Sequence, residues 1–527
     1  MSARGKTAKN TNLWQVTVGK KRAFCFVFAL LLAAFAFAPA QSSPDASPVN
    51  ATSGVFPLTT KSAEARILVN QALDLYLDRV EQEQANQILR KAIKMDPNFA
   101  MAHEFLAQIS LDPSEQVHEQ KKAYATRSSA SAPEQDVIEW YQAASDHKLI
   151  AAIPKMNDVL NRYPHDKCVV WMTTWWLMTQ NQYQRALDVY ERSGITNSPG
   201  LMNNMAYNYA YVRQFDKAFA LMDQYVAAMP KDPNPLDSYA EILRLAGRYD
   251  QSIQHYRAAL AINPKFYSSQ FGIADTYSVM GNQARARQEY EIGFSRFQLP
   301  QLHRVLWKSR EATTYVREGD YKRADRAFEG IVDWAHTRRL SQVEADTYRQ
   351  MAMYQPNPKR ALENLERAQV ALREGWNATP IELNQELAQL LRARAEIEVK
   401  MGSTGPAHLD VLRLAALADR SGDHMIDLAY HGAAGAFLFS EHNYQQAVGQ
   451  LEEDMNNPLS LKLLAEAYEK TGDHAAARRT NEIVSTFSDP TLEQALVAPQ
   501  VRKCYPDSDS SCNNNLKNAA YPMHHTM

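Results

Sequence analysis

The chain of 527 residues lacks the short motifs that mark most enzyme classes. It contains no GxGxxG or GxxxxGK[ST] loop for nucleotides, no GxSxG nucleophile elbow and no HExxH zinc-protease motif. Histidines are scattered, and Asp-His pairs fall where helices are expected to meet in turns, so capping explains them better than a catalytic dyad does. We therefore expect no enzymatic activity, no cofactor and no metal site.

Cysteine is also scarce, with four residues and no CxxC pair, which excludes a zinc framework of closely spaced thiols. Cys168 is the only thiol within the helical sequence, and we interpret it as an inert core residue. Cys504 and Cys512 lie near the C-terminus. In an oxidising compartment these two form a possible disulfide, with two free thiols as the open alternative.

Neither sign of charge is in excess. The chain has 57 basic and 59 acidic residues, for a formal net charge of −2. Proteins that bind a phosphate backbone need a basic stripe or patch, and none is evident here. Nucleic acid is therefore not expected as a partner.

Only one long apolar run occurs, and it lies near the N-terminus. Lys20, Lys21 and Arg22 precede an apolar segment over 23–38, and Ala38-Pro-Ala40 offers small residues for cleavage. The run of about 16 residues is short for a spanning helix of roughly 20. We predict a cleaved signal peptide and an exported protein, periplasmic or secreted, without a stable membrane span. A retained signal anchor is the alternative.

What the chain has in abundance is one repeated spacing. A small residue is followed by a bulky one four positions later, a small one seven later and Pro twelve later, as in Ala85-Leu89-Ala92-Pro97 and Ser252-Tyr256-Ala259-Pro264. Ala218 and Ser252 stand in register 34 residues apart, and each has an Ala twelve residues before it. Glycines such as Gly247 and Gly472 mark the expected turns between helices.

This pattern resembles the tetratricopeptide repeat, a helix-turn-helix unit of about 34 residues. The resemblance implies an all-α fold, an α-solenoid (right-handed superhelix) of stacked units, with about ten to twelve units in this chain. Small residues are expected where the two helices of a unit touch. These positions are Ala206, Ala218, Ala240, Ala274, Ala286, Ala324, Ala465 and Ala477.

The clarity of the repeats varies along the chain and suggests a division into segments. Residues 1–40 are the predicted signal peptide, 41–62 a flexible linker rich in Ser and Pro, and 491–527 a disordered tail. The repeat array is predicted over 63–339 and is clearest at 167–329. Residues 340–424 are interpreted as degenerate helical repeats and 425–490 as C-terminal repeat units.

The resemblance also implies which side chains face the concave groove, where peptide segments lie in this family. Counting positions from the turn at Tyr183 yields a candidate peptide-binding set of Trp171, Trp175, Asn203, Tyr207, Tyr211, Phe271 and Asp275. Exposed Trp and Tyr are typical anchors of an interface. The alternative is that the aromatic patch packs against the chain itself, either the 41–62 linker or a neighbouring repeat.

The function that follows is a nonenzymatic, exported scaffold that binds a protein or peptide partner in its concave groove. The alternative is a structural subunit of a cell-envelope assembly that docks by its convex face and repeat ends. A groove free of internal packing favours the first and a filled groove favours the second.

Overall fold

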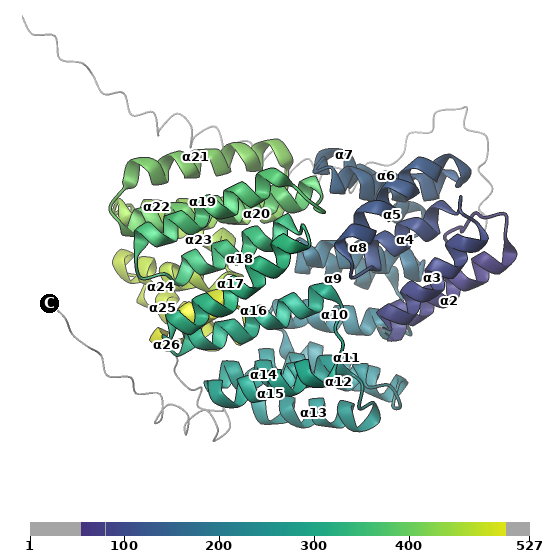
Figure 1. The fold of residues 1–527 in the computed structure, drawn as a ribbon, viewed down its shortest axis with the longest axis horizontal. Coiled ribbons are helices and arrows are strands. Elements are labelled where there is room, and N and C mark those ends of the chain that lie inside the picture. The colour runs from purple at the N-terminus through teal and green to yellow at the C-terminus, as the bar shows by residue number, and fades with distance from the viewer. Residues whose placement is uncertain (1–53, 80, 502–527) are drawn as a thin grey trace, which may run out of the picture. The chain divides into compact units, whose positions relative to one another are not determined.

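The computed structural model of the chain describes residues 54–79 and 81–501, and this part is helical without a strand. The predicted signal peptide, Cys504 and Cys512 lie outside the described residues. The helices follow one another in a tandem array (Figure 1), so the prediction of an all-α solenoid is confirmed. No helix among the described residues has both the length and the apolar character that a membrane crossing requires.

The α-helices of the described residues are α2 Ala63–Arg79, α3 Gln82–Met95, α4 Ala100–Ile109, α5 Pro113–Thr126, α6 Ala132–Ser145, α7 Leu149–Arg162, α8 Lys167–Thr179, α9 Tyr183–Ser193, α10 Pro199–Tyr211, α11 Phe215–Ala228, α12 Asn234–Leu245, α13 Tyr249–Ile262, α14 Tyr267–Met280, α15 Gln283–Arg296, α16 Gln301–Arg317, α17 Tyr321–Thr337, α18 Ser341–Tyr354, α19 Pro358–Glu374, α20 Pro380–Lys400, α21 Thr404–Ser421, α22 His424–Ser440, α23 Tyr444–Leu451, α24 Pro458–Thr471, α25 His474–Ser485 and α26 Leu492–Val501. Two 3₁₀ turns, Arg127–Ser129 and Glu452–Asp454, interrupt the series.

Consecutive helices from α2 to α25 pack in pairs, α2 with α3 through α24 with α25. These 24 helices form twelve pairs within the described residues, and α26 follows them as an unpaired helix. Each pair also contacts the next, so the apolar core continues along the array instead of closing within one unit. This continuity is what allows short helices to be stable here.

The small residues lie where the spacing placed them. In each pair we call the earlier helix the first and the later one the second. Full burial is found at Ala206, Ala240 and Ala274 on first helices and at Ala218 and Ala286 on second helices. Ala324, Ala465 and Ala477 are buried in the same way. The absence of a long side chain at these positions lets two helix backbones approach closely, so the predicted contact positions are confirmed.

The turns between helices follow the expected chemistry. Gly247 and Gly472 have φ values of 75° and 86°, the left-handed conformation that ends a helix and that glycine adopts without a steric penalty. Pro97 and Pro264 each lie one residue after a helix C-cap, at Asp96 and Asn263, because proline cannot continue the helix.

The array coils back on itself, so that units distant in sequence touch. The His147 Nε2 lies 3.0 Å from an Asp423 carboxylate oxygen, and the amide of Asn384 donates to His147 Nδ1 at 3.0 Å. Gln385 also donates to Asp423 at 3.0 Å. The third pair of helices is thereby held against the tenth and eleventh, which encloses an interior lined by first helices.

Two of the predicted boundaries are wrong within the described residues. Residues 56–62 do not form a flexible linker, because the backbone N–H of Phe56 donates to Asp166 at 2.8 Å and that of Thr59 donates to Glu134 at 2.7 Å. Residues 491–501 are not a disordered tail, because they form α26, whose Leu492 and Val497 are buried. In both segments a few apolar side chains pack against the surface of the repeats. The local composition of a segment does not reveal that such a surface lies beside it.

Candidate functional site

The predicted aromatic patch begins on α8, where Trp171 and Trp175 stack with ring centroids 5.3 Å apart. Trp171 also meets Tyr76 of α2 edge-on at 5.2 Å, so the first described helix covers it. Trp175 keeps 40% of its surface exposed. At Trp171 the structure therefore shows the internal-packing alternative, and only the rim of the pair remains accessible.

Helix α2 is fixed to the inner face by a dense set of contacts around Asp78. The Lys167 ammonium lies 2.8 Å from this carboxylate, and the backbone N–H of Gly200 donates to it at 3.2 Å. The carbonyl oxygen of Leu77 lies so close to Gly200 that a Cβ built there would sit 1.6 Å from it. Only glycine is compatible with this approach of α2 to α10.

Tyr207 and Tyr211 lie on α10 and contact different neighbours. The Tyr207 hydroxyl donates to Glu241 at 2.8 Å, whereas the Tyr211 ring stacks on Tyr183 at 4.7 Å. The Oδ1 of Asn203 is buried and accepts no hydrogen bond within the described part of the chain. The four predicted aromatic anchors are therefore not one continuous patch.

Phe271 and Asp275, the last two predicted groove residues, are unavailable to a peptide. Phe271 is fully buried and stacks on Trp307 at 4.2 Å. Asp275 accepts hydrogen bonds from Tyr290 and Arg310, and it is 1% exposed. The prediction is wrong here because α16 packs closely over this part of α14, a contact that the position count did not include.

A buried ionic network joins α12, α14 and α16, and sequence analysis selected only its Asp275. Arg244 of α12 is 1% exposed, donates to Glu241 at 2.8 Å and lies 3.6 Å from Asp275. Burial disfavours ionisation of Glu241, but the guanidinium groups of Arg244 and Arg310 outweigh it and lower the pKa of this carboxyl. An arginine three residues from a glutamate is the only signal in the sequence, and ordinary helix surfaces share it.

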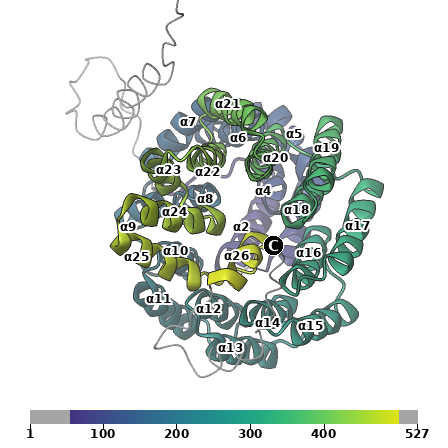
Figure 2. The same ribbon diagram turned by 90° about the vertical axis from the view of Figure 1, so that its left-hand side faces the viewer.

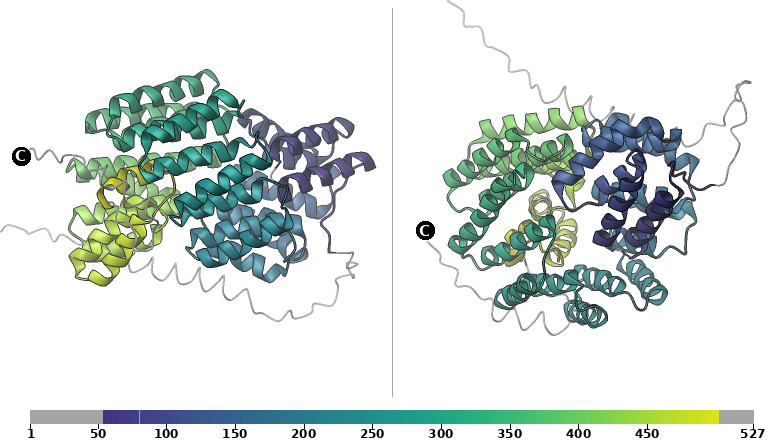
Figure 3. Two further views of the ribbon diagram at one scale, coloured as in Figure 1. Left: turned by 90° about the horizontal axis from the view of Figure 1, so that it is seen from below. Right: turned by 45° about the vertical axis from the view of Figure 1, so that its right-hand side comes forward.

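Residues 486–497, which include the start of α26, lie on the inner side of the array (Figures 2 and 3), and we name them the C-terminal segment. Its hydroxyls bond to the repeats: Arg213 donates to Thr486 Oγ1 at 2.7 Å, and the hydroxyls of Tyr249 and Ser488 are 2.6 Å apart. Helix α26 contacts α16, α24 and α25. The C-terminal segment thus fills part of the concave interior.

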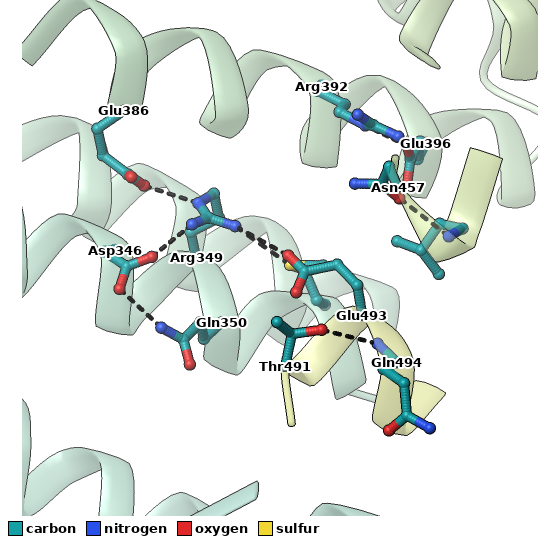
Figure 4. Close-up of polar contacts among 12 residues, drawn as sticks. Asp346, Arg349, Gln350, Glu386, Arg392, Glu396, Asn457, Thr491, Glu493 and Gln494 are labelled. Carbon is teal, nitrogen blue, oxygen red and sulfur yellow. Dashed lines mark hydrogen bonds and ion pairs between the residues drawn. The ribbon is translucent and has the colours of Figure 1, made fainter. Parts of the chain in front are cut away.

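Figure 4 shows how the charged side of α26 meets the repeats. Arg349 of α18 is surrounded by carboxylates: Glu386 accepts its Nε–H at 2.7 Å, Asp346 accepts from its Nη2, and Glu493 of α26 lies 3.9 Å away. Burial raises the pKa of Glu386 to about 7, although Arg349 opposes the shift. Glu493 is the loosest of the three partners of Arg349.

Beside the C-terminal segment a cavity of about 350 Å³ remains. Its lining from the repeats includes the aromatic residues Tyr183, Tyr211 and Phe215 and the polar residues Asn181, Arg213 and Asn456. Phe487, Ser488 and Asp489 of the C-terminal segment also line it. Of the predicted groove residues, Tyr211 is the one that lines this space.

One group of side chains has the composition of a cation site. His336, Glu344 and Glu374 bring one potential ligand atom each to within 4.8 Å of one another. The His336 Nδ1 lies 3.1 Å from Glu344, so an ordinary ion pair at the junction of α17 and α18 accounts for the approach of these two side chains. Nothing in this arrangement requires a metal.

With this geometry in place, comparison with known proteins identifies the repeat. Residues 236–266, which span α12 and α13, match the family model described as "Tetratricopeptide repeat". The protein carries tetratricopeptide repeats. The matched unit contains Ala240, Ser252 and Tyr256, the positions whose spacing first indicated the family. No curated protein matches the chain significantly.

Several solved structures resemble the chain at low sequence identity. The Cut9–Hcn1 hetero-tetramer of the APC/C is 12% identical, with 77% of this chain and 76% of that chain covered and a TM-score of 0.39. Yeast Tom70 is 12% identical over 83% and 95% of the two chains, with a TM-score of 0.37. A human IFIT1 dimer with PPP-AAAA is 13% identical over 81% and 95%, with a TM-score of 0.34. Because these scores lie below 0.5, the likenesses carry no partner or activity over to this chain.

Proposed function

We propose that this protein is a nonenzymatic scaffold that binds an extended segment of a protein partner at the cavity beside Tyr211. A tetratricopeptide-repeat solenoid is a fold suited to protein–protein interaction. The observation that carries the finer proposal is the cavity of about 350 Å³ itself. Three aromatic rings offer contact area for an apolar side chain, and Asn181 and Arg213 offer polar contacts to the backbone beside it.

A second candidate function is favoured by the filling of the rest of the interior. Helix α2 covers Trp171, and the C-terminal segment covers part of the inner face. With the groove so occupied, the convex face and the repeat ends would make the contacts of a cell-envelope assembly. The two proposals differ in whether binding depends on Tyr211.

We also propose that the protein acts outside the cytoplasm. The support is the succession of basic, apolar and small residues up to Ala40. Cell fractionation with N-terminal sequencing tests it: the exported protein should begin at or near Gln41. Recovery of the full-length chain in the cytoplasmic fraction would contradict export, and recovery in the membrane fraction would indicate a retained anchor.

Selection of peptides from a random 12-residue display library on the full chain tests the binding site. Enriched peptides should lose about tenfold or more in affinity with Tyr211→Ala, as expected for an aromatic anchor. The matched control is Tyr124→Ala, an exposed tyrosine on α5. Melting curves of both variants establish that each remains folded. Peptides that bind the two variants equally would contradict the proposal and favour docking elsewhere.

A further inference from the structure

The C-terminal segment contacts the inner face in the way a bound peptide would. It starts with a stretch without regular secondary structure, whose hydroxyls bond to Arg213 and Tyr249, and it continues into a short helix. The N–H of Gln494 donates to Thr491 Oγ1 at 3.2 Å, so Thr491 caps that helix. Leu492 is buried in the cluster that contains Ala312 and Val316 of α16.

Helix α26 depends on this surface for its order. It has ten residues, and isolated helices shorter than about 12–15 residues are marginal in water. Leu492 and Leu496, at i and i+4, pack against the cluster that contains α16, and Val497 packs with Leu461 and Val484. Leaving the surface would therefore unfold the helix, so docking and folding of the C-terminal segment form one equilibrium.

The polar contacts of the segment are few and incompletely paired. Glu493 lies 3.9 Å from Arg349, which already has two closer carboxylates. The Oε1 of Gln494 is buried and accepts no hydrogen bond within the described residues. A buried acceptor without a partner costs free energy, which favours exchange of the segment over permanent docking.

The segment also forms a wall of the cavity that the proposed function uses. Phe487, Ser488 and Asp489 line it together with Tyr211. A partner that extends from this cavity along the inner face would have to take the place of the residues that follow. Occupancy by the segment and occupancy by such a partner are mutually exclusive.

We propose that the C-terminal segment is a self-ligand that occludes the groove and that is displaced by a partner segment of the same chemistry. This inference rests on the proposed function. The partner segment carries a hydroxyl-bearing irregular stretch followed by a short helix, with leucines at i and i+4 and a carboxylate beside the first. The pattern is that of Ser488, Leu492, Glu493 and Leu496.

Release of the segment in the full chain tests the proposal. Leu492→Asp removes the buried anchor while the groove stays unchanged. The probe is a synthetic, fluorescently labelled peptide of residues 486–497, followed by anisotropy. We expect about tenfold tighter binding or more to the variant than to the unaltered chain, because apparent affinity rises with the fraction of open groove. The same peptide with Leu492→Asp should not bind.

The control protein is Leu409→Asp, at a leucine of α21 that is 56% exposed, which should bind the peptide as weakly as the unaltered chain does. If Leu492→Asp lowers the cooperative melt of the repeats, Leu496→Asp at the half-buried edge of the contact provides the same release. Equal binding of the peptide to the unaltered chain and both release variants would overturn self-occlusion. A wild-type dimer that exchanges segments between copies would overturn the assignment in cis.

The display-selected peptides separate this inference from the proposed function. If they bind the release variant more tightly than the unaltered chain, both are supported. If they bind both proteins equally, self-occlusion is wrong and the proposed site stands. If binding to both proteins is unaffected by Tyr211→Ala, the proposed site is wrong, whatever the result with the 486–497 peptide.

Discussion

The two ends of the described chain both cover the inner face, but they do so with different contacts. Helix α2 approaches α10 so closely that only glycine fits at position 200. The single residue Asp78 contacts Lys167, Ser198 and Gly200 at once. The C-terminal segment meets the repeats through scattered hydroxyls, one long ion pair and apolar side chains in two clusters, Leu492 in one and Val497 in the other.

This difference separates a permanent cover from an exchangeable one. The contact between the backbones of α2 and α10 depends on close packing. Even a small displacement of α2 would therefore break it. Helix α26 docks through side chains such as Leu492 and Val497, which the side chains of another segment could replace. We therefore interpret α2 as part of the core and the C-terminal segment as an internal ligand.

The largest expected effect lies under α2, at Trp171. Trp171→Ala should cost about 3–5 kcal/mol of unfolding free energy, because it leaves a cavity between Tyr76 and the repeats. Trp175→Ala should cost only about 1 kcal/mol, since its side chain is 40% exposed and loses mainly one stacking contact. Denaturant unfolding of the two variants compares them directly. Equal losses would mean that α2 does not seal the patch.

Gly200→Ala should cost about 3 kcal/mol, because the added methyl group would overlap the carbonyl of Leu77 and push α2 away. Gly330→Ala is the matched control in α17, where a Cβ meets nothing within 4 Å. It should stabilise the protein by about 0.5–1 kcal/mol, as alanine does in a helix. Thermal melts of both variants measure the contrast, and a harmless Gly200→Ala would contradict the close approach of α2.

The smallest expected effect is a pH dependence of the C-terminal segment at Asp489. Burial raises the pKa of this carboxyl despite the opposing guanidinium groups of Arg310 and Arg244, and the carboxylates of Glu241 and Asp275 add to the shift. The docked segment therefore holds this proton more tightly than the released one. Docking should weaken as pH rises from the released value of about 3.9 to the raised pKa, and it should then level off.

Asp489→Asn should remove this slope. The docking free energy should change with pH by about 1 kcal/mol or less, because the Asp489 residue is only half-buried. Hydrogen exchange of α26 across pH, compared between variant and unaltered chain, measures it. An unchanged slope in Asp489→Asn would show that another group controls the dependence.

The repeat architecture could be predicted from the sequence because it depends on local spacing. The buried alanines and the Gly and Pro positions at helix ends are set within one unit, so each could be read without knowing the rest. Helix α26 also left a readable signal, since Pro490 and Thr491 precede the apolar pair Leu492 and Leu496, and Glu493 lies in the first turn. It was missed because the residues after it are polar.

The candidate site was less predictable because it depends on how distant units meet. Position counting selected Tyr211, but it could not show that α16 would bury Phe271 or that α2 would cover Trp171. The stacking of Tyr183 on Tyr211 joins two units, and the hydrogen bond from Arg213 to Thr486 joins residues that are 273 positions apart in the sequence. Such contacts follow from the curvature of the solenoid, which local spacing does not determine.

Native-state hydrogen exchange on the unaltered chain tests the central contrast most directly. Amides of α2 should exchange only with large-scale unfolding of the neighbouring repeats, whereas amides of α26 should exchange through a local opening that costs at least about 2 kcal/mol less. That result would establish the C-terminal segment as the exchangeable cover of the groove. Equal protection of α2 and α26 would contradict the account.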